Sequence, residues 1–121
     1  MDSVSKNLIE VYPSSISQIT SSEQNKFLIK FSSVGCRPCV LLQEFLNAGK
    51  LRNEDNLLLY QVQIRDPKQE EVFNELRKYF QFNSVPFCVV TNKSLDLIDS
   101  YTGFKPEAFT SFIGKHFKLL N

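Results

Sequence analysis

The feature that most constrains this chain is a pair of cysteines between a buried strand and a helix. Residues 27–31 form an almost continuous apolar run with Lys30 as its one charge, which predicts a short buried strand. The apolar spacing over residues 38–46 predicts a helix. Cys36 and Cys39 stand between these two segments, so a Cys-X-X-Cys motif lies where the strand ends and the helix begins.

The spacing of the two cysteines has a chemical consequence. Side chains three positions apart at a helix start lie on one face, about 5–6 Å apart at Cβ, which is close enough for a disulfide with little strain. The free N–H groups and partial positive charge of the helix N-terminus favour a thiolate. We therefore expect Cys36 to be the low-pKa sulfur, with the positive Arg37 beside it and Pro38 suited to the first turn. We expect Cys39 to be less exposed and suited to resolving a mixed disulfide.

Composition limits the class of protein. A chain of 121 residues with 42% hydrophobic residues and 11 Phe is enough for one domain, residues 1–121, with a packed core. A net charge of +1, with neither sign in a long block, gives no support for binding nucleic acid or a membrane surface. The first 12 residues lack a signal-peptide pattern, and no stretch approaches the length of a transmembrane span. We expect a soluble, cytoplasmic monomer.

Apolar periodicity predicts alternating strands and helices. The expected strands cover residues 8–12, 27–31, 57–64, 87–91 and 95–101, and the expected helices cover 16–19, 38–47, 67–80 and a last segment from residue 106. The third helix shows one apolar face, made by Val72, Phe73, Leu76, Tyr79 and Phe80. A similar stripe in the last helix includes Phe109, Phe112, Ile113, His116, Phe117 and Leu120. Residues 52–56 are expected to form a polar loop. This order indicates an α/β sandwich whose last two strands form an antiparallel hairpin.

The chain resembles the thioredoxin family from residue 8 to about residue 117. The resemblance rests on the Cys-Arg-Pro-Cys motif five residues after a buried strand, on residues 79–86 (YFQFNSVP) leading into another strand, and on Gly103 after the hairpin. It implies a thioredoxin-like fold, with a central mixed sheet of about five strands flanked by about four helices. It also implies a cis peptide bond between Val85 and Pro86, facing the disulfide.

The same resemblance implies an activity. In thiol–disulfide exchange, the Cys36 thiolate would attack a substrate disulfide and Cys39 would then release the reduced substrate. The backbone of Val85, with Pro86 and Gly103, would bind an extended substrate segment. The implied partners are disulfide-containing proteins and an electron donor, either a reductase or a small thiol, and no cofactor is expected.

The chain departs from the family at three positions. Gly35 stands where the family usually has Trp and Arg37 where it has Gly, and the chain contains no Trp, so the usual aromatic rim is missing. Lys30 replaces the buried acid that lies six residues before the first cysteine. One hypothesis is that the Lys30 stem packs in the strand while its ammonium reaches water or an acid. The other is that a desolvated Lys30 is a proton relay, taking the Cys39 proton, or stabilises the Cys39 thiolate as a cation.

Four further residues allow two interpretations each. Cys88 is expected to be a buried inert thiol, and the alternative is a third redox partner or a dimer-forming thiol. His116 is expected to be a packed or partly exposed helix residue rather than a catalytic base. Phe87 and Phe104 either line the substrate groove or belong to the core.

Three classes of function remain open from the sequence. The leading hypothesis is a thiol–disulfide oxidoreductase that reduces protein disulfides. Arg37 should make the disulfide easier to reduce, so oxidase or isomerase activity is an alternative, and use of glutathione is another. The second class is a binding scaffold with weak redox activity. The third is a zinc site built from Cys36, Cys39, Cys88 and His116, which has only one close ligand pair, so no metal is expected.

Overall fold

The secondary structure follows the predicted order of strands and helices. The computed structural model describes residues 8–53 and 56–120. Its elements are β1 (Ile9–Val11), α1 (Ser17–Thr20), β2 (Phe27–Ser32), α2 (Arg37–Asn47), β3 (Leu58–Gln63), the 3-10 helix η1 (Pro67–Gln69), α3 (Glu70–Leu76), β4 (Phe87–Thr91), β5 (Leu97–Thr102) and α4 (Pro106–Gly114). Residues 1–7, which hold most of the segment judged for a signal peptide, and residues 54–55 of the expected polar loop lie outside the described residues.

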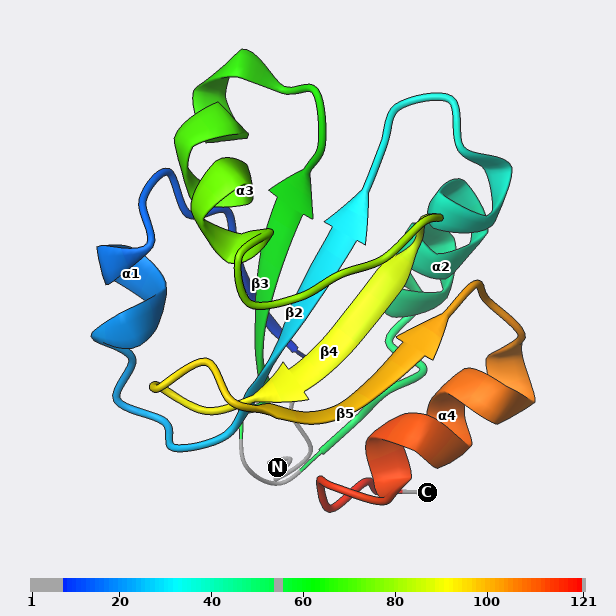
Figure 1. Ribbon diagram of the computed structural model, residues 1–121. Helices are drawn as coiled ribbons and strands as arrows, with labels where there is room; N and C mark the ends of the chain where they lie inside the picture. Colours follow the sequence, from blue (N-terminus) through cyan, green and yellow to red (C-terminus); the bar gives the residue numbers. More distant parts are fainter. Residues whose placement is uncertain (1–7, 54–55, 121) are drawn as a thin grey trace.

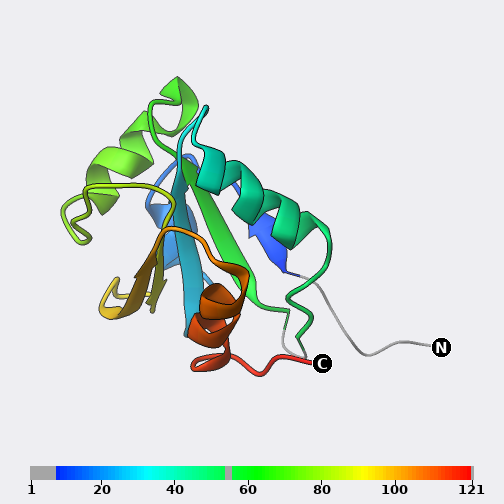
Figure 2. The same cartoon turned by 90° about the vertical axis from the view of Figure 1, so that its right-hand side faces the viewer.

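The five strands form one mixed sheet in the order β1-β3-β2-β4-β5 (Figure 1). β3 is parallel to both β1 and β2, whereas β4 is antiparallel to both β2 and β5. Figures 1 and 2 show α1 and α3 on one face of the sheet and α2 and α4 on the other. The predicted α/β sandwich with a closing antiparallel hairpin is therefore confirmed.

The central strand β2 is buried along its whole length. Phe27, Ile29 and Phe31 point into the core beneath α1 and α3, whereas Leu28 belongs to the core beneath α2 and α4. A strand covered on both faces needs apolar side chains at successive positions rather than in alternation. This requirement explains the almost continuous apolar run, and it makes the charge of Lys30 the exception.

Two predicted helices end earlier than expected. α3 ends at Leu76 instead of continuing to Phe80, and 51% of the Tyr79 side chain surface is exposed, so its placement on the core face was wrong. Phe80 is still buried, because the turn after α3 returns the chain to the sheet. α4 ends at Gly114, so His116 lies beyond the helix.

Two smaller differences concern loops. Leu95 was expected to begin a strand but lies in the turn before β5, with a positive φ of 62° and a buried side chain. Asn53, expected in a polar loop, is fully buried, and its Oδ1 accepts a hydrogen bond from the Leu57 N–H at 2.8 Å. A buried amide with a backbone partner holds the loop against the domain. Among the described residues, no helix is both long enough and apolar enough to cross a membrane.

One side-chain pair joins the edge strand to the chain end. His116 Nε2 lies 2.7 Å from Asp99 Oδ2, linking β5 to the segment after α4. The hydrogen bond from His116 lowers the pKa of Asp99 below its ordinary value. An aspartate with a lowered pKa in the folded state stabilises the fold above its unfolded pKa, and this contribution is lost as the pH falls through the folded pKa.

The pair predicts a pH-dependent stability difference. We expect His116→Leu to lower the free energy of unfolding at pH 5.5, and we expect the deficit to shrink as the pH falls below about 4, the ordinary aspartate value. Urea unfolding of the wild-type protein and the variant at several pH values measures this difference in free energy. Asp99→Asn is the matched control, since it removes the titrating group and should lose the same contribution. A His116→Leu deficit that stays constant from pH 5.5 to 3 would contradict this assignment.

Candidate active site

The cysteine motif lies at the C-terminal end of the central strand. After β2 the chain turns through Gly35, whose φ of +83° is in the left-handed region that favours glycine. Cys36 then adopts an extended conformation as the N-cap of α2, and its Sγ accepts a hydrogen bond from the Cys39 N–H at 3.3 Å. The sulfur therefore takes the place of a capping oxygen and lies in the partial positive charge of the helix N-terminus. Arg37 and Pro38 are exposed in the first turn.

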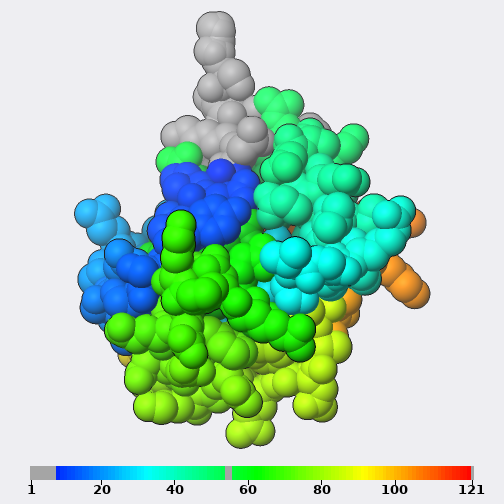
Figure 3. All heavy atoms as spheres, turned by 90° about the horizontal axis from the view of Figure 1, so that it is seen from above, coloured from blue at the N-terminus to red at the C-terminus, as the bar shows by residue number. Residues whose placement is uncertain are grey.

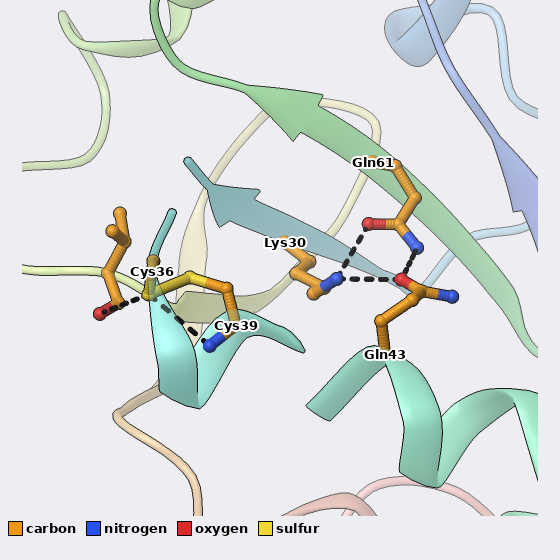
Figure 4. Close-up of a disulfide and its surroundings, with 6 residues drawn as sticks. Lys30, Cys36, Cys39, Gln43 and Gln61 are labelled. Atoms are coloured by element: carbon orange, nitrogen blue, oxygen red, sulfur yellow. Dashed lines mark hydrogen bonds between the residues drawn. A yellow bond between two sulfur atoms is a disulfide. The ribbon is translucent and has the colours of Figure 1, made fainter. Parts of the chain in front are cut away.

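Cys36 and Cys39 form a disulfide, with their Cα atoms 5.2 Å apart (Figure 4). This separation is within the ordinary range for a disulfide, as the spacing predicted. Cys39 is 5% exposed, whereas Cys36 is only half-buried. The predicted difference in exposure between the outer and the inner sulfur is confirmed.

The three residues expected to bind substrate are brought to this end of the sheet. The Val85–Pro86 peptide bond is cis, and the Val85 carbonyl oxygen lies 3.5 Å from Cys36 Sγ. The Gly103 N–H donates a hydrogen bond of 2.8 Å to the Pro86 carbonyl, and Gly103 has a φ of +88°. A backbone carbonyl beside the reactive sulfur gives an extended peptide a place to pair. Substrate binding by these residues stays a prediction.

Figure 4 shows Lys30 to one side of the disulfide, with its Nζ directed toward Gln43 and Gln61. Lys30 is 3% exposed, and its Nζ donates hydrogen bonds to Gln43 Oε1 on α2 at 2.9 Å and to Gln61 Oε1 on β3 at 3.0 Å. The amides of Gln43 and Gln61 both donate to the Glu10 carboxylate, at 3.0 and 2.7 Å. Lys30 therefore has no direct contact with a carboxylate among the described residues, and the side-chain amides of Gln43 and Gln61 lie between it and Glu10.

Burial lowers the pKa of Lys30 from its ordinary value, and negative charge at Cys88 and Glu10 opposes the shift. Burial also raises the pKa of Cys88 to about 12, with Lys30 acting against the rise. The Cys88 thiol is therefore neutral at neutral pH, so Glu10 is the anion that favours the charged form of Lys30. The sequence did not identify Gln43, Gln61 or Glu10 as partners of this charge.

Lys30 and the inner cysteine line the same pocket. It has a volume of about 410 Å³ and is lined by Lys30, Ser32, Cys39, Gln43 and Gln63, among others. Ser32 and Gln63 are register partners on β2 and β3, and Ser32 Oγ and Gln63 Oε1 are buried without a hydrogen-bond partner among the described residues. Buried polar atoms are usually satisfied by protein or by ordered water, so this pocket suits water beside Cys39.

The remaining candidates pack or pair with residues outside the cysteine motif. Phe87 is buried and stacks on Phe82, which supports the core interpretation, and half-buried Phe104 packs against Phe45 and Phe109. His116 pairs with Asp99. Among residues 8–53 and 56–120, no group of three or more His, Cys, Asp or Glu side chains is placed to hold a metal ion.

Cys88 provides a test of the buried-thiol interpretation. It is 1% exposed and faces Lys30 across β2 and β4, so in the reduced native protein we expect alkylation more than about 100-fold slower than for an ordinary thiol. Peptide mass spectrometry after a short iodoacetamide pulse at pH 8 measures the labelling of each cysteine. The same pulse in denaturant is the control and should label Cys88 fully. Native labelling of Cys88 at the rate of Cys36 would show instead that this thiol is accessible.

Solved structures of thioredoxin-fold proteins are similar to this chain over most of its length. The oxidised thioredoxin of Plasmodium falciparum is 18% identical with a TM-score of 0.67, over 92% of this chain and 99% of that chain. The thioredoxin of Malassezia sympodialis is also 18% identical with a TM-score of 0.67, over 96% of each chain. A protein described as DsbH oxidoreductase is 14% identical with a TM-score of 0.63, over 93% of this chain and 85% of that chain.

The likeness is one of structure. No protein-family model matches the sequence, and no curated protein matches it. The mixed five-stranded sheet and its flanking helices nevertheless match those solved structures. The chain therefore has the thioredoxin fold, with Cys36 and Cys39 at disulfide distance at the start of α2.

Proposed function

We propose that this protein is a thiol–disulfide oxidoreductase that reduces disulfides in protein substrates through Cys36 and Cys39. The observation that carries the proposal is the position of the Cys36 sulfur, which caps α2 and lies 3.5 Å from the Val85 carbonyl oxygen. One sulfur is thus placed where a thiolate is favoured and where a peptide backbone can pair. The described neighbours include proteins named as thioredoxins and one named as an oxidoreductase, which supports the same chemistry.

The reaction begins with the dithiol form. The Cys36 thiolate attacks one sulfur of the substrate disulfide, forming a mixed disulfide and releasing one substrate thiolate. Cys39, as a thiolate, then attacks Cys36 Sγ, closing the intramolecular disulfide and releasing the second substrate thiolate. Two electrons pass to the substrate, and its sulfurs take up the two protons that the protein thiols lose. A reductase or a small thiol returns the protein to the dithiol form.

Substrate docking uses the backbone of Val85, with Pro86 and Gly103 holding the segment in place. The Gly103 N–H is bonded to the Pro86 carbonyl, so these residues form one fixed edge. A segment that carries the substrate disulfide would lie along this edge with its sulfur beside Cys36. In a reducing compartment such as the cytoplasm, this activity would contribute to redox homeostasis.

Lys30 acts on the inner cysteine as a buried cation. It shares a pocket with Cys39, and burial strengthens electrostatic interactions because little water screens them. A charged Lys30 stabilises the Cys39 thiolate that attacks the mixed disulfide. The same charge favours the reduced protein and makes its disulfide easier to reduce, as Arg37 does at the surface. Because of these two charges, oxidase or isomerase activity remains an alternative to reductase activity. A redox titration against glutathione distinguishes the two, since it measures how easily the disulfide is reduced.

The cysteine variants test the reaction itself. We expect Cys36→Ser to reduce insulin disulfides no faster than the uncatalysed background, and Cys39→Ser to accumulate a mixed disulfide because its resolving thiol is missing. Turbidity and non-reducing gels measure these outcomes. Cys88→Ala is the matched control and should keep wild-type activity. If the wild-type protein were no faster than the Cys36→Ser/Cys39→Ser double variant, the scaffold hypothesis would replace this one.

Lys30→Met tests the buried cation. Methionine fills a similar space without charge, and we expect the acid limb of the rate–pH profile to move up by about one pH unit as the Cys39 pKa rises. The disulfide should also become harder to reduce in the glutathione titration. Lys30→Arg keeps the charge and is the matched control, with circular dichroism confirming that both variants fold. An unchanged profile in folded Lys30→Met would remove Lys30 from the mechanism.

A further inference from the structure

A second hollow lies on the α3 side of the sheet, and its lining ends at Val85, the residue whose carbonyl contacts Cys36. It has a volume of about 720 Å³ and is lined by residues from four segments: the loop after β2, the turn after β3, α3 with the residues that follow it, and the segment before β4. Figure 3 shows these segments gathered on one face, in cyan, green and yellow-green. We call this hollow, which includes Ser33, Arg65, Phe73, Arg77 and Val85, the arginine groove.

The arginine groove extends to Val85, whose backbone contacts the reacting sulfur. Val85 forms one wall, and its carbonyl oxygen is the atom 3.5 Å from Cys36 Sγ. Ser33 forms another wall, three positions before the same cysteine. A substrate segment that pairs with Val85 would therefore extend its neighbouring side chains into this groove.

The charges in the groove have one sign. Arg65 and Arg77 line it and no Asp or Glu does. Within the described parts of the chain, neither guanidinium is within ion-pair distance of a carboxylate. The Arg77 guanidinium lies over the Phe73 ring, 5.4 Å from its centre, a contact that fixes the group without neutralising it.

The two arginines are not equivalent. Asp66 and Glu70 line a smaller neighbouring pocket together with Arg65, so part of the field of Arg65 is offset there. Asp66 also caps η1 by accepting from the Lys68 N–H at 2.9 Å. Arg77 does not line that pocket, so we assign it the larger part of the groove's positive potential.

From this arrangement we propose that the arginine groove selects disulfide substrates that carry acidic side chains next to the reacting cysteine. Arg77 is the main specificity-determining residue and Arg65 assists it. This inference rests on the proposed thiol–disulfide exchange and specifies its substrate class. A guanidinium can bind a carboxylate through two parallel hydrogen bonds, which suits Asp or Glu better than a neutral side chain.

The size of the effect follows from the exposure of both arginines. Exposed ion pairs contribute little each, so removing one guanidinium should lower kcat/KM for an acidic substrate by about 2- to 5-fold. Because salt screens exposed charges, the preference should weaken as ionic strength rises. The chemical step involves neither arginine, so the loss should be smaller on a neutral peptide than on the acidic one.

Three fluorescence-quenched peptides with one disulfide test the inference, with two Glu, two Gln or two Lys residues flanking the reacting cysteine. We expect wild-type kcat/KM to follow the order Glu, Gln, Lys at low salt. Arg77→Gln should reduce the preference for the Glu peptide, Arg65→Gln should reduce it less, and Arg77→Glu should invert it towards the Lys peptide. Lys93→Gln, in the turn at the far end of β4 from Pro86, is the matched control for net charge and should behave as wild type.

Different results would contradict substrate selection by the arginine groove and the proposed thiol–disulfide exchange. Equal wild-type rates on all three peptides, or an equal loss on all three in Arg77→Gln, would overturn the arginine groove while leaving the oxidoreductase intact. No reduction of any peptide by the wild-type dithiol would overturn the proposed function itself. An inverted preference in Arg77→Glu cannot come from misfolding, because a misfolded enzyme would lose activity on every peptide.

Discussion

The hydrogen-bonded network around the buried amine of Lys30 organises the polar residues between the sheet and α2. Placing a charge in the core is unfavourable unless hydrogen bonds and a countercharge compensate it. Gln61 and Gln43 supply the hydrogen bonds and Glu10 the countercharge, so the network joins β1, β2, β3 and α2. Polar residues in this part of the core are therefore tied to one another, and α2 with its cysteines is held in the same network.

The strand-to-helix junction determines what the two sulfurs can do. Cys36 has to leave the strand and cap the helix, which the left-handed turn at Gly35 allows. Cys39 follows one turn later and points inward, so it is shielded from solvent by the same geometry that exposes its partner. The difference in exposure between the two sulfurs thus follows from the geometry of the helix start.

Much of the fold was predictable because strands and helices leave periodic apolar patterns. The pattern did not predict where α3 ends, since apolar residues continue past Leu76 into the turn that follows the helix, and Tyr79 was misplaced as a result. The cysteine pair was predictable because its chemistry is local in sequence. The partners of Lys30 were not, because Gln43 and Gln61 lie 13 and 31 residues away and only tertiary packing brings them together. Arg65 and Arg77 line the same groove for the same reason, because tertiary packing brings together residues that are distant in the sequence.

Lys30 and the two arginines of the groove lie in different environments, one buried and the other exposed to water. Lys30 is buried, so its effect on the Cys39 thiolate depends little on dissolved salt. Arg65 and Arg77 are exposed, and at physiological ionic strength their field decays over about 8 Å, so it reaches only a substrate already at the groove. A change in salt should therefore alter the proposed substrate selection by the arginine groove more than the proposed effect of Lys30 on Cys39. In the proposed mechanism, ionic strength thus distinguishes the contribution of the arginine groove from that of Lys30.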